Sequence, residues 1–153
     1  MKRNGLMIML VVLVCTCMVG PVNAQSWKGW RGSGGWGTDT PYQRMYNTST
    51  VETISGEVIG IEQTVPMRRM NKGIAVMLKT DKEMVAVHLG PSWYIERLET
   101  KIVKGDKIEV KGSRVTFTGK PAIIAAQVKK GGDVLILRDS AGVPVWAGWG
   151  QKR

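Results

Sequence analysis

The chain has 153 residues, which suits one small domain, and its 22 Lys and Arg against 12 Asp and Glu give a net charge of +10. This basic balance favours anionic partners over cationic ones. Both cysteines, Cys15 and Cys17, lie near the start of the chain. The remainder therefore has no means of forming a disulfide, a thiolate metal site or a cysteine nucleophile.

The first 24 residues have the three parts of a secretory signal. Lys2 and Arg3 form a basic start, an apolar run covers 6–19, and the small residues Val22 and Ala24 mark a cleavage site. The run is shorter than the roughly 20 residues that cross a bilayer, so we expect cleavage near Ala24 rather than an anchor. The protein would then be periplasmic or secreted, touching the membrane only transiently through this signal.

Residues 25–49 are rich in tryptophan and glycine and lack helical or strand periodicity, so we expect an irregular arm. Its W-x-G-W pattern recurs in the tail, residues 140–153. The tryptophans either bind a partner as exposed anchors or fold back and seal the domain, and both alternatives stay open. The candidate anchors are Trp27, Trp30, Trp36, Trp93, Trp146 and Trp149.

Strand patterns dominate from residue 50 to residue 139. Gly56 and Gly60 interrupt the first strand and predict a bulge or bend there. Val76, Val87 and Val110 are expected to face the core. The predicted strands are 51–65, 73–80, 83–89, 107–117, 121–128 and 134–137, and the one predicted helix is 93–100.

A long bent strand, a hairpin, a short helix and further strands follow the order of an oligonucleotide/oligosaccharide-binding (OB) barrel. We therefore expect an all-β fold, a small OB-like five-stranded barrel with one short helix between strands three and four and irregular Trp/Gly-rich termini. Closure of the barrel protects the strand edges, which a small domain needs. A small β-sandwich is the alternative.

Several segments resemble a family of small exported bacterial OB-like proteins. They are TVETISGEV at 50–58, HLGPSWY at 88–94, GKPAIIAA at 119–126, and the run from LRD at 137–139 to PVW at 144–146. A related domain is similar to one in magnetosome-associated proteins of the S/X type, some of which carry haem motifs. The resemblance implies the fold and export, and it implies no activity. The chain has no Cys-x-x-Cys-His motif, so we expect no covalent haem.

A methionine and histidine face is the candidate metal site. With a turn at 81–82, the outward side of the hairpin carries Met77, Met84 and His88, and Met67 and Met70 lie in the loop before it. Thioether and imidazole ligands suit copper(I), the only cofactor indicated. The alternative is a half-buried methionine patch in which His88 bonds to the backbone.

Basic residues in the same loop, Arg68, Arg69 and Lys72, are candidates for binding an anionic partner. OB proteins bind single-stranded nucleic acids by stacking bases on aromatic side chains. The outward positions of the hairpin hold no aromatic ring apart from the imidazole of His88. Nucleic acid is therefore the less favoured partner.

The sequence shows no motif that indicates an enzyme active site. The only histidine lies in an apolar strand, and no phosphate-binding loop or zinc-spaced cluster occurs. Our leading hypothesis is a non-enzymatic periplasmic OB-fold binding or accessory module for an unknown protein or an anionic envelope component. The alternatives are an accessory protein for metal or redox proteins that uses the methionine and histidine face, and a weak binder of polyanions or nucleic acid.

Overall fold

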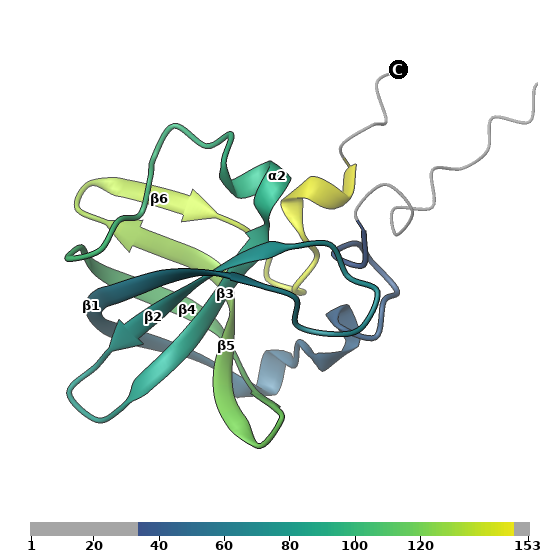
Figure 1. The fold of residues 1–153 in the computed structure, drawn as a ribbon, viewed down its shortest axis with the longest axis horizontal. Helices are drawn as coiled ribbons and strands as arrows, with labels where there is room; N and C mark the ends of the chain where they lie inside the picture. The colour runs from purple at the N-terminus through teal and green to yellow at the C-terminus, as the bar shows by residue number, and fades with distance from the viewer. Residues whose placement is uncertain (1–33, 149–153) are drawn as a thin grey trace, which may run out of the picture.

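Six strands form one strongly bent sheet in the computed structural model, which describes residues 34–148 (Figure 1). All six strands were predicted within one or two residues of their observed ends. The strands are β1 (Val51–Thr64), β2 (Gly73–Lys79), β3 (Met84–Pro91), β4 (Lys107–Phe117), β5 (Lys120–Lys130) and β6 (Asp133–Ile136).

Five of these strands close into a ring. The sheet order is β3-β2-β1-β4-β5-β6, and a short parallel pairing between β3 and β5 joins its ends. The ring thus runs β1-β2-β3-β5-β4 and returns to β1, while β6 pairs only with the C-terminal part of β5. This closure confirms the predicted OB-like five-stranded barrel and excludes the β-sandwich.

The first strand bends so that it can serve two neighbours. Its beginning pairs with β4 from Val51 to Glu57, and its end pairs with β2 from Glu57 to Thr64. The register shifts between Val58 and Gly60, where the sequence predicted a bulge. The extra residue re-aims the strand and lets one strand belong to both sides of the ring.

The hairpin of β2 and β3 has the predicted register. Lys79 pairs with Met84 and Ala75 pairs with His88, and the turn between them is closed by the Thr80 amide donating to the Glu83 carbonyl over 2.8 Å. Since strand side chains alternate, this register directs Val76 and Val87 into the barrel and places His88 on its outer face.

The helix between β3 and β4 is shorter than predicted. It covers only Ser92–Ile95 (α2), instead of 93–100. The next amides, those of Arg97 and Leu98, donate three residues back instead of four, so the last turn tightens and the helix ends. The β-branched residues Thr100, Ile102 and Val103 that follow disfavour helix continuation.

The segments outside the barrel are irregular apart from short 3-10 turns, as predicted for the termini. These turns are η1 (Gln43–Met45) and η2 (Thr48–Thr50) before the barrel and η3 (Val145–Gly148) after it. Within residues 34–148, no helix has the length and apolar character needed to span a bilayer. The predicted signal, including its cleavage near Ala24, lies outside the described residues, as do Trp27, Trp30 and Trp149.

The core fills the inside of the ring and extends under the terminal segments. Val76, Val87 and Val110, predicted to face inward, are each 0 % exposed. Trp36 and Trp146, from opposite ends of the described chain, are also fully buried and belong to the same cluster. The terminal segments are therefore part of the packed domain.

Val87→Asp tests this core. The substitution would place an unpaired carboxylate inside the barrel, at a cost of several kcal/mol, comparable to the total stability of a small domain. We expect a population that is largely unfolded, or a large drop in melting temperature followed by circular dichroism. Met84→Asp is the matched control, because Met84 lies on the same strand and is 58 % exposed. Equal melting temperatures for the two variants would contradict the register.

Candidate functional site

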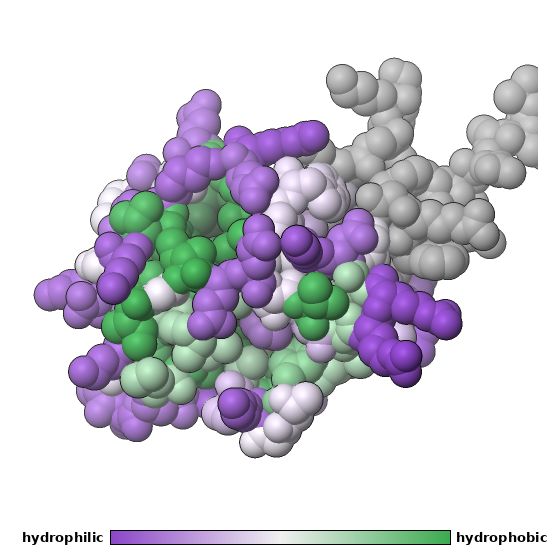
Figure 2. All heavy atoms as spheres, viewed as in Figure 1, coloured by the Kyte–Doolittle hydropathy of each residue, from purple (hydrophilic) through white to green (hydrophobic). Residues whose placement is uncertain are grey.

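A groove of about 610 Å³ lies between the segment that precedes β1 and the loop that joins β1 to β2. We call it the arm–loop groove. Figure 2 shows strongly hydrophilic side chains gathered at this end of the molecule. The groove is lined by Gly34, Gly35, Thr40, Pro41 and Tyr42 from the arm and by Met67, Arg68, Arg69 and Met70 from the loop.

Hydrogen bonds hold the arm against the loop. The Asn71 amide donates to the Gly34 carbonyl over 2.7 Å, and the indole Nε1 of Trp36 donates to the Asn71 carbonyl over 2.8 Å. The arm and the loop approach so closely that a Cβ on Gly34 would lie 2.1 Å from the Asn71 side chain. The glycine content that predicted an irregular arm thus also permits this contact.

The groove carries the basic residues that the sequence predicted as binding residues. Arg68 and Arg69 line it, Lys72 follows in the same loop, and all three are exposed. Arg69 has a φ of 67°, a left-handed conformation that is uncommon for a residue with a Cβ and that clusters at functional sites. The charged side chains that line the groove are both arginines, and none of its described lining residues is acidic.

The five predicted metal ligands are divided among different places. Met67 and Met70 line the groove, Met77 lies half-buried on β2, and Met84 is exposed on β3. Met84 lies four residues before His88, a separation of roughly 13 Å along a strand that rises about 3.3 Å per residue. One metal ion cannot contact both, since ligand bonds are about 2 Å long.

His88 lies beneath the arm and is 6 % exposed. Its Nδ1 shares a 3.2 Å hydrogen bond with the Tyr42 hydroxyl, and its ring stacks on Phe117 with centroids 5.0 Å apart. Burial first, and then the charge of Arg138, lower the pKa of His88 from 6.5 to about 4. The imidazole is therefore neutral at neutral pH, and its partner is a tyrosine instead of the backbone.

Arg138 is a buried charge that the sequence analysis did not single out. It is 3 % exposed, its Nη1 donates to the Ala125 carbonyl over 2.6 Å, and its guanidinium lies 5.0 Å from the ring centroid of Trp146. Its Nε and Nη2 have no hydrogen-bond partner among residues 34–148. Burial lowers the pKa of Arg138 and raises that of Tyr42. The sequence feature that could have indicated this buried charge is the position of an arginine directly after an apolar strand.

The described tryptophans differ in exposure. Trp36 and Trp146 are fully buried and joined by a hydrogen bond from the Trp146 Nε1 to the Trp36 carbonyl over 2.7 Å. Trp93 is half-buried and packs against the core. In these positions Trp36 and Trp146 seal the barrel and offer no exposed ring to a partner.

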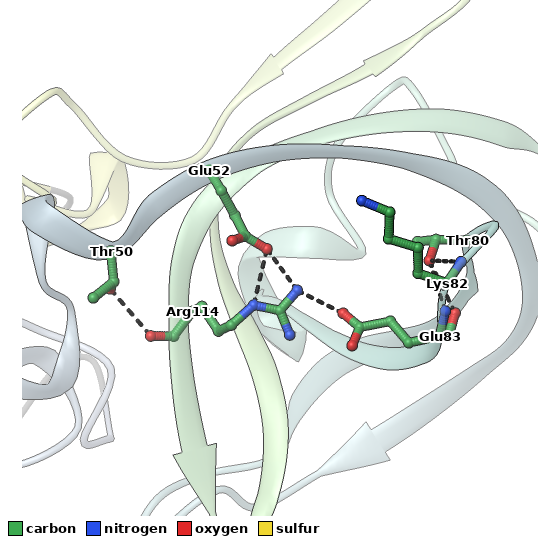
Figure 3. A network of polar contacts seen from close by, with 6 residues as sticks. All are labelled: Thr50, Glu52, Thr80, Lys82, Glu83 and Arg114. Carbon is green, nitrogen blue, oxygen red and sulfur yellow. Dashed lines mark hydrogen bonds and ion pairs between the residues drawn. The ribbon is translucent and has the colours of Figure 1, made fainter.

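A second polar network, also missed from the sequence, joins β1, β4 and the β2–β3 turn at another part of the barrel (Figure 3). Arg114 on β4 donates to Glu52 on β1 from Nε over 2.9 Å and from Nη2 over 2.6 Å, and Nη2 also lies 2.5 Å from Glu83. These hydrogen bonds, the one to Glu52 first, raise the pKa of Arg114. The network ties the hairpin turn to the neighbouring strands, so its groups are committed to structural contacts.

No group of three His, Cys, Asp or Glu side chains in the described part of the chain could hold a metal ion. The two acids of the helix region, Glu96 and Glu99, are exposed. The buried ionisable groups, His88 and Arg138, serve packing contacts. The arm–loop groove is therefore the best candidate for a binding site.

The lowered pKa of His88 predicts a pH-dependent stability. Because the folded value is below the unfolded one, the stabilising contribution of the neutral imidazole is complete above about pH 6.5 and is lost as the pH falls through about 4, a loss of roughly 3 kcal/mol. We expect His88→Asn, which keeps an acceptor near the Nδ1 position, to lose this part of the pH dependence. Urea unfolding of both proteins from pH 7 to pH 4 measures the difference, and parallel curves would contradict it.

Comparison with known proteins gives one family. Residues 50–135 match the model of the MamS/MamX magnetosome protein family, and no curated protein matches the chain. The matched region covers β1 to β5 and most of β6, which is the whole ring of the barrel. It includes the loop that forms one side of the arm–loop groove, with Arg68 and Arg69. The chain belongs to the MamS/MamX magnetosome protein family.

Proposed function

We propose that this chain is a non-enzymatic, exported binding module that uses the arm–loop groove to hold an acidic segment of a partner protein. The observation that carries the proposal is the pair of exposed arginines, Arg68 and Arg69, in a groove whose described lining has no acidic residue. The family description supports a place for this module among magnetosome proteins.

The groove suits a peptide with both acidic and apolar side chains. A guanidinium matches the planar geometry of a carboxylate and donates two parallel hydrogen bonds to it. Met67 and Met70 add flexible apolar surface, which adapts to varied side chains. Tyr42, the lining aromatic residue, is 1 % exposed, so it offers little surface for base stacking. These features favour an acidic polypeptide over a nucleic acid.

The position of the groove agrees with how this fold binds ligands. OB barrels place ligands against the loop between their first two strands and the adjacent surface. Here that loop holds Arg69 in its left-handed conformation. Glycine would adopt this conformation without strain. An arginine side chain at this position is therefore expected to make a functional contact that offsets the strain.

Arg69→Gly separates binding from stability. Removing one guanidinium–carboxylate contact should weaken the binding of an acidic peptide about tenfold, since such a contact contributes roughly 1.5 kcal/mol. Stability should be unchanged or slightly higher, because glycine relieves the left-handed strain while giving the unfolded chain more freedom. Fluorescence anisotropy with a labelled peptide of alternating glutamate and leucine measures the affinity, and urea unfolding measures the stability.

Lys111→Gln is the control, because Lys111 is exposed on β4 and its replacement also removes one positive charge. It should change peptide affinity by less than about twofold, as screened charges at a distance do. Equal losses in the two variants would show attraction to any polyanion instead of a site. Oligothymidylate that binds as tightly as the peptide would favour the nucleic-acid alternative.

Soft-metal binding is the second candidate function, favoured by the presence of Met67 and Met70 in one groove. Thioethers select copper(I). We expect Met67→Leu with Met70→Leu to abolish copper(I) retention in competition with a colorimetric chelator, while Met84→Leu, at an exposed position on β3, leaves it intact. A wild-type protein that never competes with the chelator would remove this candidate.

A further inference from the structure

A second cavity, of about 250 Å³, opens at the end of the barrel beside β6 and shares no lining residue with the arm–loop groove. We call it the barrel-end pocket. Figure 2 shows a hollow bordered by apolar side chains on the side where Figure 1 places β6 and the segment that follows α2. The aliphatic lining residues are Ile61, Ile74, Val76, Leu89, Ile95, Leu98, Ile102, Leu135 and Leu137.

The chemistry of this lining is uniform. Every strand around the pocket contributes aliphatic groups, and the only lining residues with polar side chains are Glu96, Thr100 and Lys101, all from the segment after α2. The described lining has no aromatic residue. Such a surface offers dispersion contacts to an aliphatic group but no partner for hydrogen bonds inside the pocket.

The segment after α2 covers the pocket and is tied down by lysines. The Lys101 ammonium donates to the Glu96 carbonyl, and the Lys130 ammonium donates to the Lys101 carbonyl over 2.6 Å. Lys130 also forms an ion pair with Asp106 at 2.9 Å. Lys101 has no carboxylate within ion-pair distance in the described part of the chain, so a positive charge without an acidic partner lies at the rim.

The pocket has room for a ligand. An engineered apolar cavity of about 150 Å³ stays dry and takes up benzene, and this pocket is larger. Ile61 at its border is 43 % exposed, and the neighbouring strand β6 exposes Val134 and Ile136 by 49 % and 51 %. Exposed apolar groups around a hollow are typical of ligand sites.

We propose that the barrel-end pocket binds an unbranched aliphatic chain with an anionic headgroup, the chain inside the barrel and the headgroup at the Lys101 ammonium. Burial of each methylene contributes about 0.8 kcal/mol, so a medium-length chain supplies enough binding free energy without polar contacts. The unpaired lysine selects a carboxylate or phosphate over a neutral headgroup. The ligand is either a free fatty acid or the acyl chain of a phospholipid.

Decanoate is the probe for the free acid, with decanol as its neutral counterpart and acetate as the headgroup without a chain. Isothermal titration of the purified full chain should show one decanoate site, weaker decanol binding and no acetate binding. Lys101→Gln should weaken the binding of decanoate by up to about fivefold and leave the binding of decanol unchanged, as expected for a contact at a solvent-exposed rim. Glu96→Gln should strengthen decanoate, because it removes a negative charge from the same rim.

Leu98→Trp fills the pocket and should abolish the binding of both decanoate and decanol. Val103→Trp is its control, because Val103 belongs to the same segment, is 50 % exposed and does not line the pocket. Equal melting temperatures of the two variants show that the loss is not unfolding. Decanoate binding that survives Leu98→Trp, or a wild-type protein that binds neither decanoate nor lipid, overturns the proposal.

Sedimentation with phosphatidylglycerol vesicles identifies the source of the chain. Vesicle binding that Leu98→Trp abolishes and Arg69→Gly leaves intact assigns the pocket to phospholipid acyl chains. Decanoate binding without vesicle binding assigns it to free fatty acids. Vesicle binding that only Arg69→Gly weakens reflects the charge of the arm–loop groove and overturns the lipid assignment.

Discussion

The hydrogen-bonded chain of two tryptophans is the contact on which the rest of this structure depends. Trp146 donates to the carbonyl of Trp36, and Trp36 donates to the carbonyl of Asn71, so both terminal segments are joined to the loop between β1 and β2. Trp36 also packs where a Cβ on Gly73 would lie 2.1 Å from its ring. These tryptophans take no part in the strand pairing of the ring, but they belong to its core and hold in place the segments that form the arm–loop groove and the cover over His88.

The buried guanidinium of Arg138 depends on this cover for part of its contacts. A guanidinium taken out of water without a carboxylate partner is costly, and the observed contacts offset only part of that cost: one carbonyl, the face of Trp146 and the proximity of Tyr42. The contacts with Trp146 and Tyr42 require the terminal segments in their observed places, whereas the carbonyl belongs to Ala125 on β5. The same positive charge contributes to keeping His88 neutral. Replacing Trp146 would therefore expose a charge as well as remove packing.

The two proposed sites use different parts of the molecule. The arm–loop groove is basic and lies between the arm and the β1–β2 loop, whereas the barrel-end pocket is aliphatic and lies inside the opposite part of the ring beside β6. Neither needs a reactive side chain, and the Arg114 network keeps Glu52 and Glu83 in ion pairs. The molecule thus combines a basic groove with a separate apolar pocket.

The sequence by itself determined the strands, the hairpin register and the order of an OB barrel, because alternation of apolar residues and turn residues are local properties. It also determined which loop carries Arg68 and Arg69. Only the tertiary structure decided the burial of Trp36 and Trp146 and the roles of Arg114 and Arg138. Those depend on contacts between residues far apart in the chain: Trp36 and Trp146 are 110 positions apart, and Glu52 and Arg114 are 62 apart. The spacing of residues along the chain does not reveal such contacts, because the closure of the ring creates them.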